Sequence, residues 1–310
     1  MDHVSTVPAR AIRTVFKAGR AAAATSRLAS PFSYICITSL SALNKATSED
    51  GRVRYRTEEG EKTMTQRTVE VDTADGTCPA SLSIPEGEGP WPAVIMYPDA
   101  GGMRDVFRAM GERLSALGYV VLVPDFYYRN GPYDLGDLKT AFSREASREK
   151  IMQMMQGYTT DLAVSDAAAY VDYLNALPEK VPGGIGTTGY CMGGRLSLTA
   201  AANLGASVAA AASFHGGGLA KAGDPNSPHH RADSIRATVY VAGAIRDQSF
   251  TDADKELLEK SLTETGVSHT IETYQAQHGF AVPDNETYDE AAAERHWHAM
   301  ESLFGSALAS

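Results

Sequence analysis

One short motif in the chain has the residue types and spacing of a catalytic nucleophile. Residues 189–194 read Gly-Tyr-Cys-Met-Gly-Gly, which places a glycine two positions before Cys191 and another two positions after it. The motif joins an apolar run typical of a strand to a helical pattern, and its glycines permit a turn tight enough to expose the side chain between them. The thiol would stand at a helix N-terminus, where the helix dipole favours a thiolate. The alternative, a small buried apolar cysteine, fits this spacing less well.

A thiol nucleophile needs a base, and the base needs an orienting carboxylate. His278 lies just past the last predicted strand, and Asp247 follows the predicted strand over residues 237–242. Both side chains would come to the carboxyl ends of their strands. The chain order of nucleophile, acid and histidine is the order that a Gly-x-nucleophile-x-Gly enzyme uses. We therefore predict a triad of Cys191, Asp247 and His278.

Other residues compete weakly for these roles. His215 also follows a predicted strand and is a second candidate for the base. Asp252 and Asp254 compete with Asp247, but both fall at the start of a helix, where capping accounts for them. The remaining histidines in this half of the chain, expected on a solvated loop or in later elements, receive no role: His229, His230, His269, His296 and His298.

Acyl transfer also needs donors for an oxyanion. The backbone N–H of Met192, directly after the nucleophile, is the first expected donor. The second is expected from the loop over residues 98–102, Pro-Asp-Ala-Gly-Gly, where we select Ala100. Gly101 and Gly102 would let this backbone approach a substrate closely.

The elements that must position these residues alternate between strand and helix. Strands are predicted at residues 67–73, 80–84, 92–97, 119–123, 184–189, 207–214, 237–242 and 269–274. Helices are predicted at residues 106–117, 161–177, 192–203, 257–262 and 288–303, with a loop and a covering helix within 126–158. Asp75-Gly76 predicts a hairpin turn between the first two strands. The pattern indicates a mostly parallel central sheet with helices on both faces. Together with the nucleophile motif at residues 189–194, it predicts an α/β-hydrolase fold.

Residues 1–63 differ from the rest and are expected to lie outside the domain, which we place at 64–310. The first 48 residues hold six Lys or Arg and one acid, and a charged stretch follows. We expect a disordered extension, with Met64 a candidate for the true start. A presequence that directs the chain to an organelle is the alternative, and a secretory signal fits less well.

Composition narrows the classes of partner and cofactor. A net charge of −10 argues against nucleic acid or an anionic membrane as the partner. Three cysteines without close spacing indicate free thiols in a reducing compartment, so we expect a cytoplasmic protein. No apolar run approaches the roughly 18 residues of a membrane helix. We expect no metal and no cofactor, a small-molecule substrate, and a monomer or small homo-oligomer.

Over residues 67–307 the sequence resembles the dienelactone hydrolase family. The resemblance is carried by residues 189–194, by Asp247 after its strand, by His278-Gly279-Phe280-Ala281, and by Val123-Pro124-Asp125-Phe126-Tyr127. It implies an α/β-hydrolase fold and hydrolysis of esters or lactones through an acyl-thioester intermediate.

The resemblance also implies site residues at which this chain departs from the family. Family members carry a glutamate after the first buried strand that interacts with the resting thiol, and Asp99 stands there. An arginine shortly after the catalytic histidine binds a substrate carboxylate in the family, whereas Val282 follows here. Arg144 and Arg148, in the covering region, are the candidates for such a contact. We therefore expect slow turnover of dienelactone relative to neutral esters.

Two other functions compete with a cysteine-dependent ester or lactone hydrolase. One is a broader carboxylesterase or thioesterase, which a substrate panel would separate. The other is a ligand-binding or thiol-sensing protein on the same scaffold, which the presence of all three triad residue types disfavours. A haloalkane dehalogenase is excluded, because its nucleophile is a carboxylate.

Overall fold

The computed structural model describes residues 45–47, 52–57 and 60–308, with side chains described from Met64 onward. Most of the predicted extension over residues 1–63 lies outside the described residues. Strands nevertheless occur within it, because β2 (Arg52–Thr57) pairs with the start of β3 (Gly60–Thr73). The strand predicted at residues 67–73 therefore begins earlier in the structure, at Gly60.

Strands and helices alternate over most of the chain. The remaining strands are β1 (Lys45–Thr47), β4 (Gly76–Pro85), β5 (Ala93–Tyr97), β6 (Val120–Pro124), β7 (Ile185–Tyr190), β8 (Val208–Phe214), β9 (Thr238–Ala244) and β10 (His269–Tyr274). The helices are α1 (Asp105–Ser115), α2 (Leu138–Ala141), α3 (Glu145–Gly157), α4 (Thr160–Asn175), α5 (Met192–Leu204), α6 (Asp252–Glu264) and α7 (Glu290–Ala307). Short 3-10 turns are η2 (Tyr128–Asn130), η3 (Gly205–Ser207) and η4 (Pro228–Ser234). Each predicted strand is confirmed to within a few residues, apart from the earlier start of β3.

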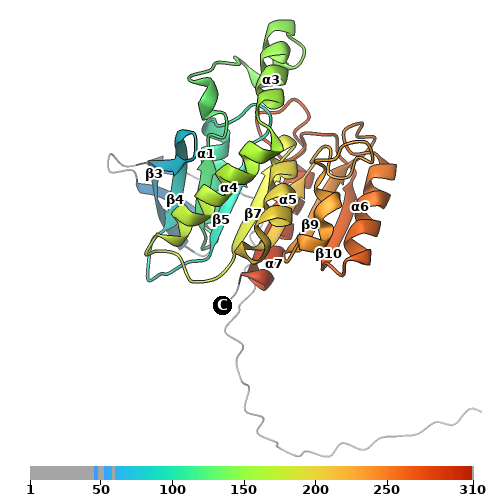
Figure 1. The fold of residues 1–310 in the computed structure, drawn as a ribbon. Coiled ribbons are helices and arrows are strands. Elements are labelled where there is room, and N and C mark those ends of the chain that lie inside the picture. Colours follow the sequence, from blue (N-terminus) through green and yellow to red (C-terminus); the bar gives the residue numbers. More distant parts are fainter. Residues whose placement is uncertain (1–44, 48–51, 58–59, 309–310) are drawn as a thin grey trace, which may run out of the picture. The chain divides into compact units, whose positions relative to one another are not determined.

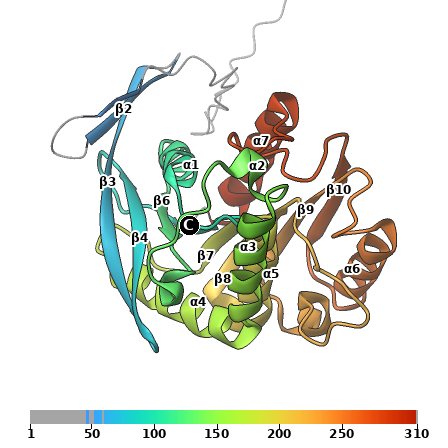
Figure 2. The same ribbon diagram turned by 90° about the horizontal axis from the view of Figure 1, so that it is seen from above.

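The described strands form one sheet in the order β1-β2-β3-β4-β6-β5-β7-β8-β9-β10. The six strands β6-β5-β7-β8-β9-β10 pair parallel with one another. The strands before them pair antiparallel, including the predicted hairpin of β3 and β4. Figure 2 shows the sheet with α1 and α7 on one side and α4, α5 and α6 on the other. This is the α/β-hydrolase fold that the sequence predicts.

Both faces of the central strands are buried, which explains their unbroken apolar sequences. Val94 of β5 packs in one apolar cluster with Phe107 of α1 and Phe304 of α7. The next residue, Ile95, points to the opposite face and packs with Tyr170 of α4. This alternation fixes the strand between two helical layers and thereby fixes where the loop at its carboxyl end emerges.

Helix α6 begins earlier than the sequence predicts. Its first residue is Asp252, whereas the apolar spacing starts only at Leu257. Thr251 caps the helix, and Thr251 and Asp254 form a reciprocal capping box. A charged first turn that is stabilised by caps carries no apolar pattern, which explains the difference.

The segment over residues 126–158 contains η2, α2 and α3 and is tied down by a buried ion pair. Arg129 of η2 donates to both carboxylate oxygens of Asp166 in α4, each at 2.7 Å. Tyr158 Oη donates to the same carboxylate at 3.0 Å. Asp166 is fully buried, so loss of Arg129 would leave an unpaired charge in the interior. Figure 1 shows α3 projecting beyond the ends of the central strands.

Candidate active site

The turn between β7 and α5 holds Cys191 in a strained backbone conformation. Its φ and ψ are 52° and −115°, a region that residues with a side chain rarely adopt. A Cβ on Gly189 would overlap the carbonyl of Gly193, and a Cβ on Gly193 would overlap the carbonyls of Tyr97 and Pro98. Both glycines are therefore needed for α5 to start this close to the sheet. The turn leaves the Cys191 side chain half-buried, at a helix N-terminus.

The structure brings the three predicted triad residues together. His278 follows β10, and its Nδ1 lies 2.8 Å from Oδ2 of Asp247, which follows β9. Cys191 also lies close enough to His278 for the charge of its sulfur to raise the pKa of the imidazole. Asp247 is held in turn by Ser249, whose backbone N–H and Oγ donate to Oδ1 at 2.9 and 2.6 Å. The carboxylate therefore orients an imidazole that lies near the thiol.

The electrostatics of these contacts favour a protonated imidazole at His278 beside an ionised Asp247. Burial opposes protonation of His278, but the charge of Cys191 and the hydrogen bond that His278 donates to the Asp247 carboxylate outweigh it and raise the pKa of His278 to about 10. Burial also opposes ionisation of Asp247, but its hydrogen bond to His278, the His278 charge and the Ser249 donors lower its pKa to about 2. At neutral pH, Asp247 is therefore ionised and His278 is protonated.

We expect the protonation of His278 to depend on Cys191. In the wild type, the imidazole should keep its proton as the pH rises through 7 and should lose it only near pH 10. In Cys191→Ala the largest favourable contribution disappears, so the pKa should fall back toward the ordinary value of about 6.5. An NMR titration of the His278 ring in both proteins measures this. Equal pKa values in the two proteins would contradict a thiolate-imidazolium pair.

Two backbone donors are candidates for the oxyanion hole. Met192 is the first residue of α5, so its N–H has no acceptor within the helix. The loop after β5 is fixed by Asp99, whose carbonyl accepts from Gly102 N–H at 2.9 Å and whose Oδ1 accepts from Gly101 N–H at 2.8 Å. Ala100 lies within this turn and is buried. The packing of α5 against the end of β5 thus places both predicted donors on neighbouring elements.

Asp99 is placed differently from the thiol-interacting role expected for it. Its two carboxylate oxygens accept from Arg104 at 2.7 and 2.9 Å. The same guanidinium donates to both oxygens of Asp284, at 2.7 and 2.8 Å. The side chains of Arg104 and Asp99 are 15% and 11% exposed, whereas that of Asp284 is 36% exposed. Asp99 thereby joins the loop after β5 to the loop that follows His278, rather than engaging the thiol of Cys191.

The two arginines selected for a substrate carboxylate are not poised for it. Arg144 is exposed and donates to the backbone carbonyls of Leu135 and Asp137, at 2.7 and 3.1 Å. Arg148 lies one turn further along α3 and is also exposed. Val282 is fully buried in the apolar core. The position at which the family carries an arginine therefore packs in the core instead.

Sequence reasoning missed Ser249 and Arg104, which the structure places near the triad, and named His215 only as an alternative base. Ser249 holds Asp247, and only the Asp-x-Ser spacing signals such a turn. Arg104 pairs with Asp99, and no local pattern in the sequence indicates this contact. His215 accepts a hydrogen bond at Nδ1 from the Cys191 backbone N–H, at 3.2 Å. A carboxylate orients a catalytic base, and Asp247 forms its hydrogen bond with His278 rather than with His215. His278 therefore remains the candidate base.

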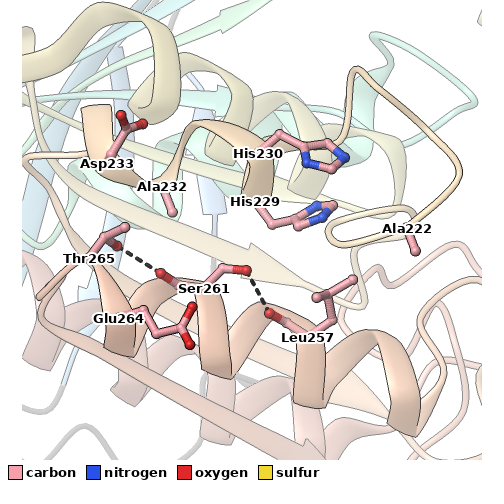
Figure 3. Close-up of a pocket in the computed structure, with 9 residues that line it drawn as sticks. All are labelled: Ala222, His229, His230, Ala232, Asp233, Leu257, Ser261, Glu264 and Thr265. Atoms are coloured by element: carbon pink, nitrogen blue, oxygen red, sulfur yellow. Dashed lines mark hydrogen bonds between the residues drawn. The ribbon is translucent and has the colours of Figure 1, made fainter.

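A hollow lies between η4 and α6 (Figure 3). It is lined by Ala222, His229, His230, Ala232, Asp233, Leu257, Ser261, Glu264 and Thr265. The sequence predicts a solvated loop for His229 and His230, and this is wrong for His229. Proline at the first position starts η4 and turns His229 inward, where only 7% of it is exposed and burial lowers its pKa. The hollow includes no triad residue.

Comparisons with known proteins bear on the family of this chain. A model of the dienelactone hydrolase family matches residues 78–308. The chain belongs to the dienelactone hydrolase family. A candidate carboxymethylenebutenolidase of Synechocystis sp. is 31% identical to it over 256 residues, which cover 78% of this chain and 99% of that protein.

Solved structures of the same family share its fold. A dienelactone hydrolase-like promiscuous phosphotriesterase from metagenomic libraries superposes with a TM-score of 0.66 at 26% identity, over 79% of this chain and 98% of that one. The structure named m3DLH superposes with a TM-score of 0.68 at 25% identity, with the same coverage of both chains. As a member of this family, the chain has a hydrolase scaffold. No helix in the described ranges is long and apolar enough to cross a membrane.

Proposed function

We propose that the protein hydrolyses esters or lactones through a thioester on Cys191. The observation that carries this proposal is the hydrogen bond between Asp247 and His278, together with a thiol held near the imidazole at a strained strand-to-helix turn. A thiolate is a strong nucleophile, and an imidazolium beside it can supply the proton that the leaving group needs. Neither group requires a metal or an organic cofactor.

The first half-reaction forms the thioester. The Cys191 thiolate attacks the acyl carbon, and the carbonyl electron pair moves to oxygen, where the amides of Met192 and Ala100 would stabilise the negative charge. Collapse of this intermediate breaks the bond to the alkoxide, which takes the proton from His278. An ester releases its alcohol at this point, whereas the hydroxyl of an opened lactone stays attached to the acyl group.

The second half-reaction returns the resting pair. Water attacks the thioester carbon while neutral His278 takes one of its protons, and the bond from carbon to sulfur breaks. The product leaves as the carboxylic acid, and the thiolate and imidazolium are restored. Asp247 remains ionised throughout and keeps the proton of neutral His278 on Nδ1, so that the other nitrogen faces the thiol.

A trapped thioester tests this mechanism. We expect acid quenching during turnover of p-nitrophenyl acetate to leave one acetyl group on the peptide that contains Cys191. The adduct should be released by hydroxylamine and should be absent from Cys191→Ala. Peptide mass spectrometry measures both. Turnover without any adduct on Cys191, or an equal adduct on Cys191→Ala, would count against a cysteine nucleophile. Labelling without turnover would favour the thiol-sensing alternative.

The charges near the site favour uncharged substrates. Arg104 is paired with both Asp99 and Asp284, so this group of three carries a net negative charge. Arg144 binds backbone carbonyls, and Val282 offers no donor. A buried substrate carboxylate without a partner loses its hydration and gains no ion pair in return. We therefore propose neutral short-chain esters or uncharged lactones as the substrate class.

We expect dienelactone to be turned over more slowly than its uncharged methyl ester. The difference in kcat/KM should be about 10-fold or more, because the carboxylate loses hydration without finding a guanidinium fork. Steady-state kinetics on the two compounds measures it, with Arg144→Gln and Arg148→Gln as matched variants that should leave the ratio unchanged. A preference for the charged compound that disappears in either variant would reverse the proposal and identify the carboxylate contact.

A further inference from the structure

His215 contacts both the candidate nucleophile and the candidate base without belonging to the triad. It follows β8, is 1% exposed, and accepts from the Cys191 N–H at Nδ1, at 3.2 Å. Its ring meets the His278 ring with centroids 5.1 Å apart and a tilt of 61°. The ring of Phe280 packs edge-to-face on it at 5.0 Å. One buried ring therefore bridges the turn at Cys191 and the loop at His278.

The geometry also fixes the protonation state of His215. A backbone N–H can only donate, so Nδ1 must be unprotonated and the proton must lie on Nε2. Burial first, and then the charges of His278 and His296, hold the pKa of His215 well below its usual range. His215 therefore stays neutral beside a protonated His278, and both rings can pack together without repulsion.

Keeping a histidine at this place is energetically unfavourable. Its Nε2 is buried with no hydrogen-bond partner among the described residues, a state that is rare in protein interiors. Its backbone φ is 40°, in the left-handed region that favours glycine. An unpaired buried donor and a strained backbone at the same residue both cost stability, and they point to a role for the side chain that offsets this cost.

We propose that His215 is a positioning residue that sets the separation and angle between Cys191 and His278. This rests on the proposed function. The Cys191 N–H is shared between Phe214 O, at 3.1 Å, and Nδ1 of His215, so the side chain helps to orient the turn. The ring also limits rotation of His278 about its hydrogen bond to Asp247. A displacement of about 1 Å in such a pair can lower a rate about 100-fold.

Two substitutions separate these actions. His215→Asn keeps an acceptor close to the position of Nδ1 but removes most of the ring, whereas His215→Phe keeps a ring and removes the acceptor. Each should lower kcat for p-nitrophenyl acetate by about 10-fold to 100-fold, with KM changed by less than about threefold. Each should also slow alkylation of Cys191 by iodoacetamide. His296→Phe is the matched control, because His296 is equally buried but its ring packs on Tyr190, Phe214 and Trp297 and not on His278.

A double-mutant comparison distinguishes positioning from a general structural role. His215→Asn should slow alkylation of Cys191 in the wild-type background and should have no further effect in His278→Ala, because its ring acts through His278. An equal loss in both backgrounds, or a folded His215→Asn with wild-type kcat and alkylation rate, would overturn the proposal. If His215→Phe fails to fold, the asparagine variant alone decides. Alkylation requires no ester, so failure of the proposed hydrolysis would appear separately, as a wild type without turnover.

Discussion

Replacing Cys191 by alanine is expected to abolish ester hydrolysis and to leave the fold intact. The chemistry requires a nucleophile at this position, and removal of one typically lowers kcat by about 10⁴-fold or more. The fold does not require the thiol, because Cys191 is half-buried and makes its backbone contacts through its amide. Alanine can occupy the same tight turn, since its Cβ replaces the existing one. Steady-state kinetics and circular dichroism on the same preparation measure both effects.

Two further variants show whether the thiol itself matters. Cys191→Ser should also be poor, because a hydroxyl is a much weaker acid than a thiol and must be deprotonated during attack. Cys78→Ala is the matched control. Cys78 is a free cysteine that is fully buried, where burial raises its pKa to about 12, so it is not a nucleophile at neutral pH. Wild-type rates in a folded Cys191→Ala variant would end the thiol mechanism.

Much of the fold could be predicted because its core elements have simple sequence patterns. Strands such as β5 and β6 are buried on both faces and therefore read as unbroken apolar runs. The hairpin between β3 and β4 follows from Asp75-Gly76. The missed parts are polar elements. β2 reads Arg-Val-Arg-Tyr-Arg-Thr, a short alternation with only two large apolar residues inside a charged stretch, and the first turn of α6 is charged and has no apolar spacing.

The site could be predicted only where chain order and strand ends determine it. Asp247 and His278 meet because parallel strands bring their carboxyl ends to one edge of the sheet. The pairing of Asp99 with Arg104 could not be predicted in this way. Arg104 also pairs with Asp284, which is 180 residues away, and no local pattern in the sequence connects them. Contacts between loops depend on three-dimensional packing and not on spacing.

The second large effect is expected at the base. His278→Ala should lower kcat by about 10⁴-fold or more, because it removes both the proton donor for the leaving group and the charge beside the thiolate. The residues that position His278 should matter less than His278 itself. Asp247→Asn is therefore expected to lower kcat severely, but about 10-fold to 100-fold less than loss of the imidazole.

The hydrogen bonds around Asp247 explain why asparagine should be harmful there despite its similar size. Ser249 donates twice to the position of Oδ1, so in the Asp247→Asn variant these donors hold the amide oxygen at that position. The amide nitrogen must then face Nδ1 of His278, which has to accept, and the imidazole proton moves to the nitrogen that faces Cys191. A histidine in this tautomer cannot accept a proton from water during hydrolysis of the thioester. Deacylation should therefore slow more than acylation, and single-turnover kinetics should show the acyl-enzyme accumulating. Asp247→Asn with unchanged deacylation, or His215→Ala as the only inactivating histidine change, would assign the base to a residue other than His278.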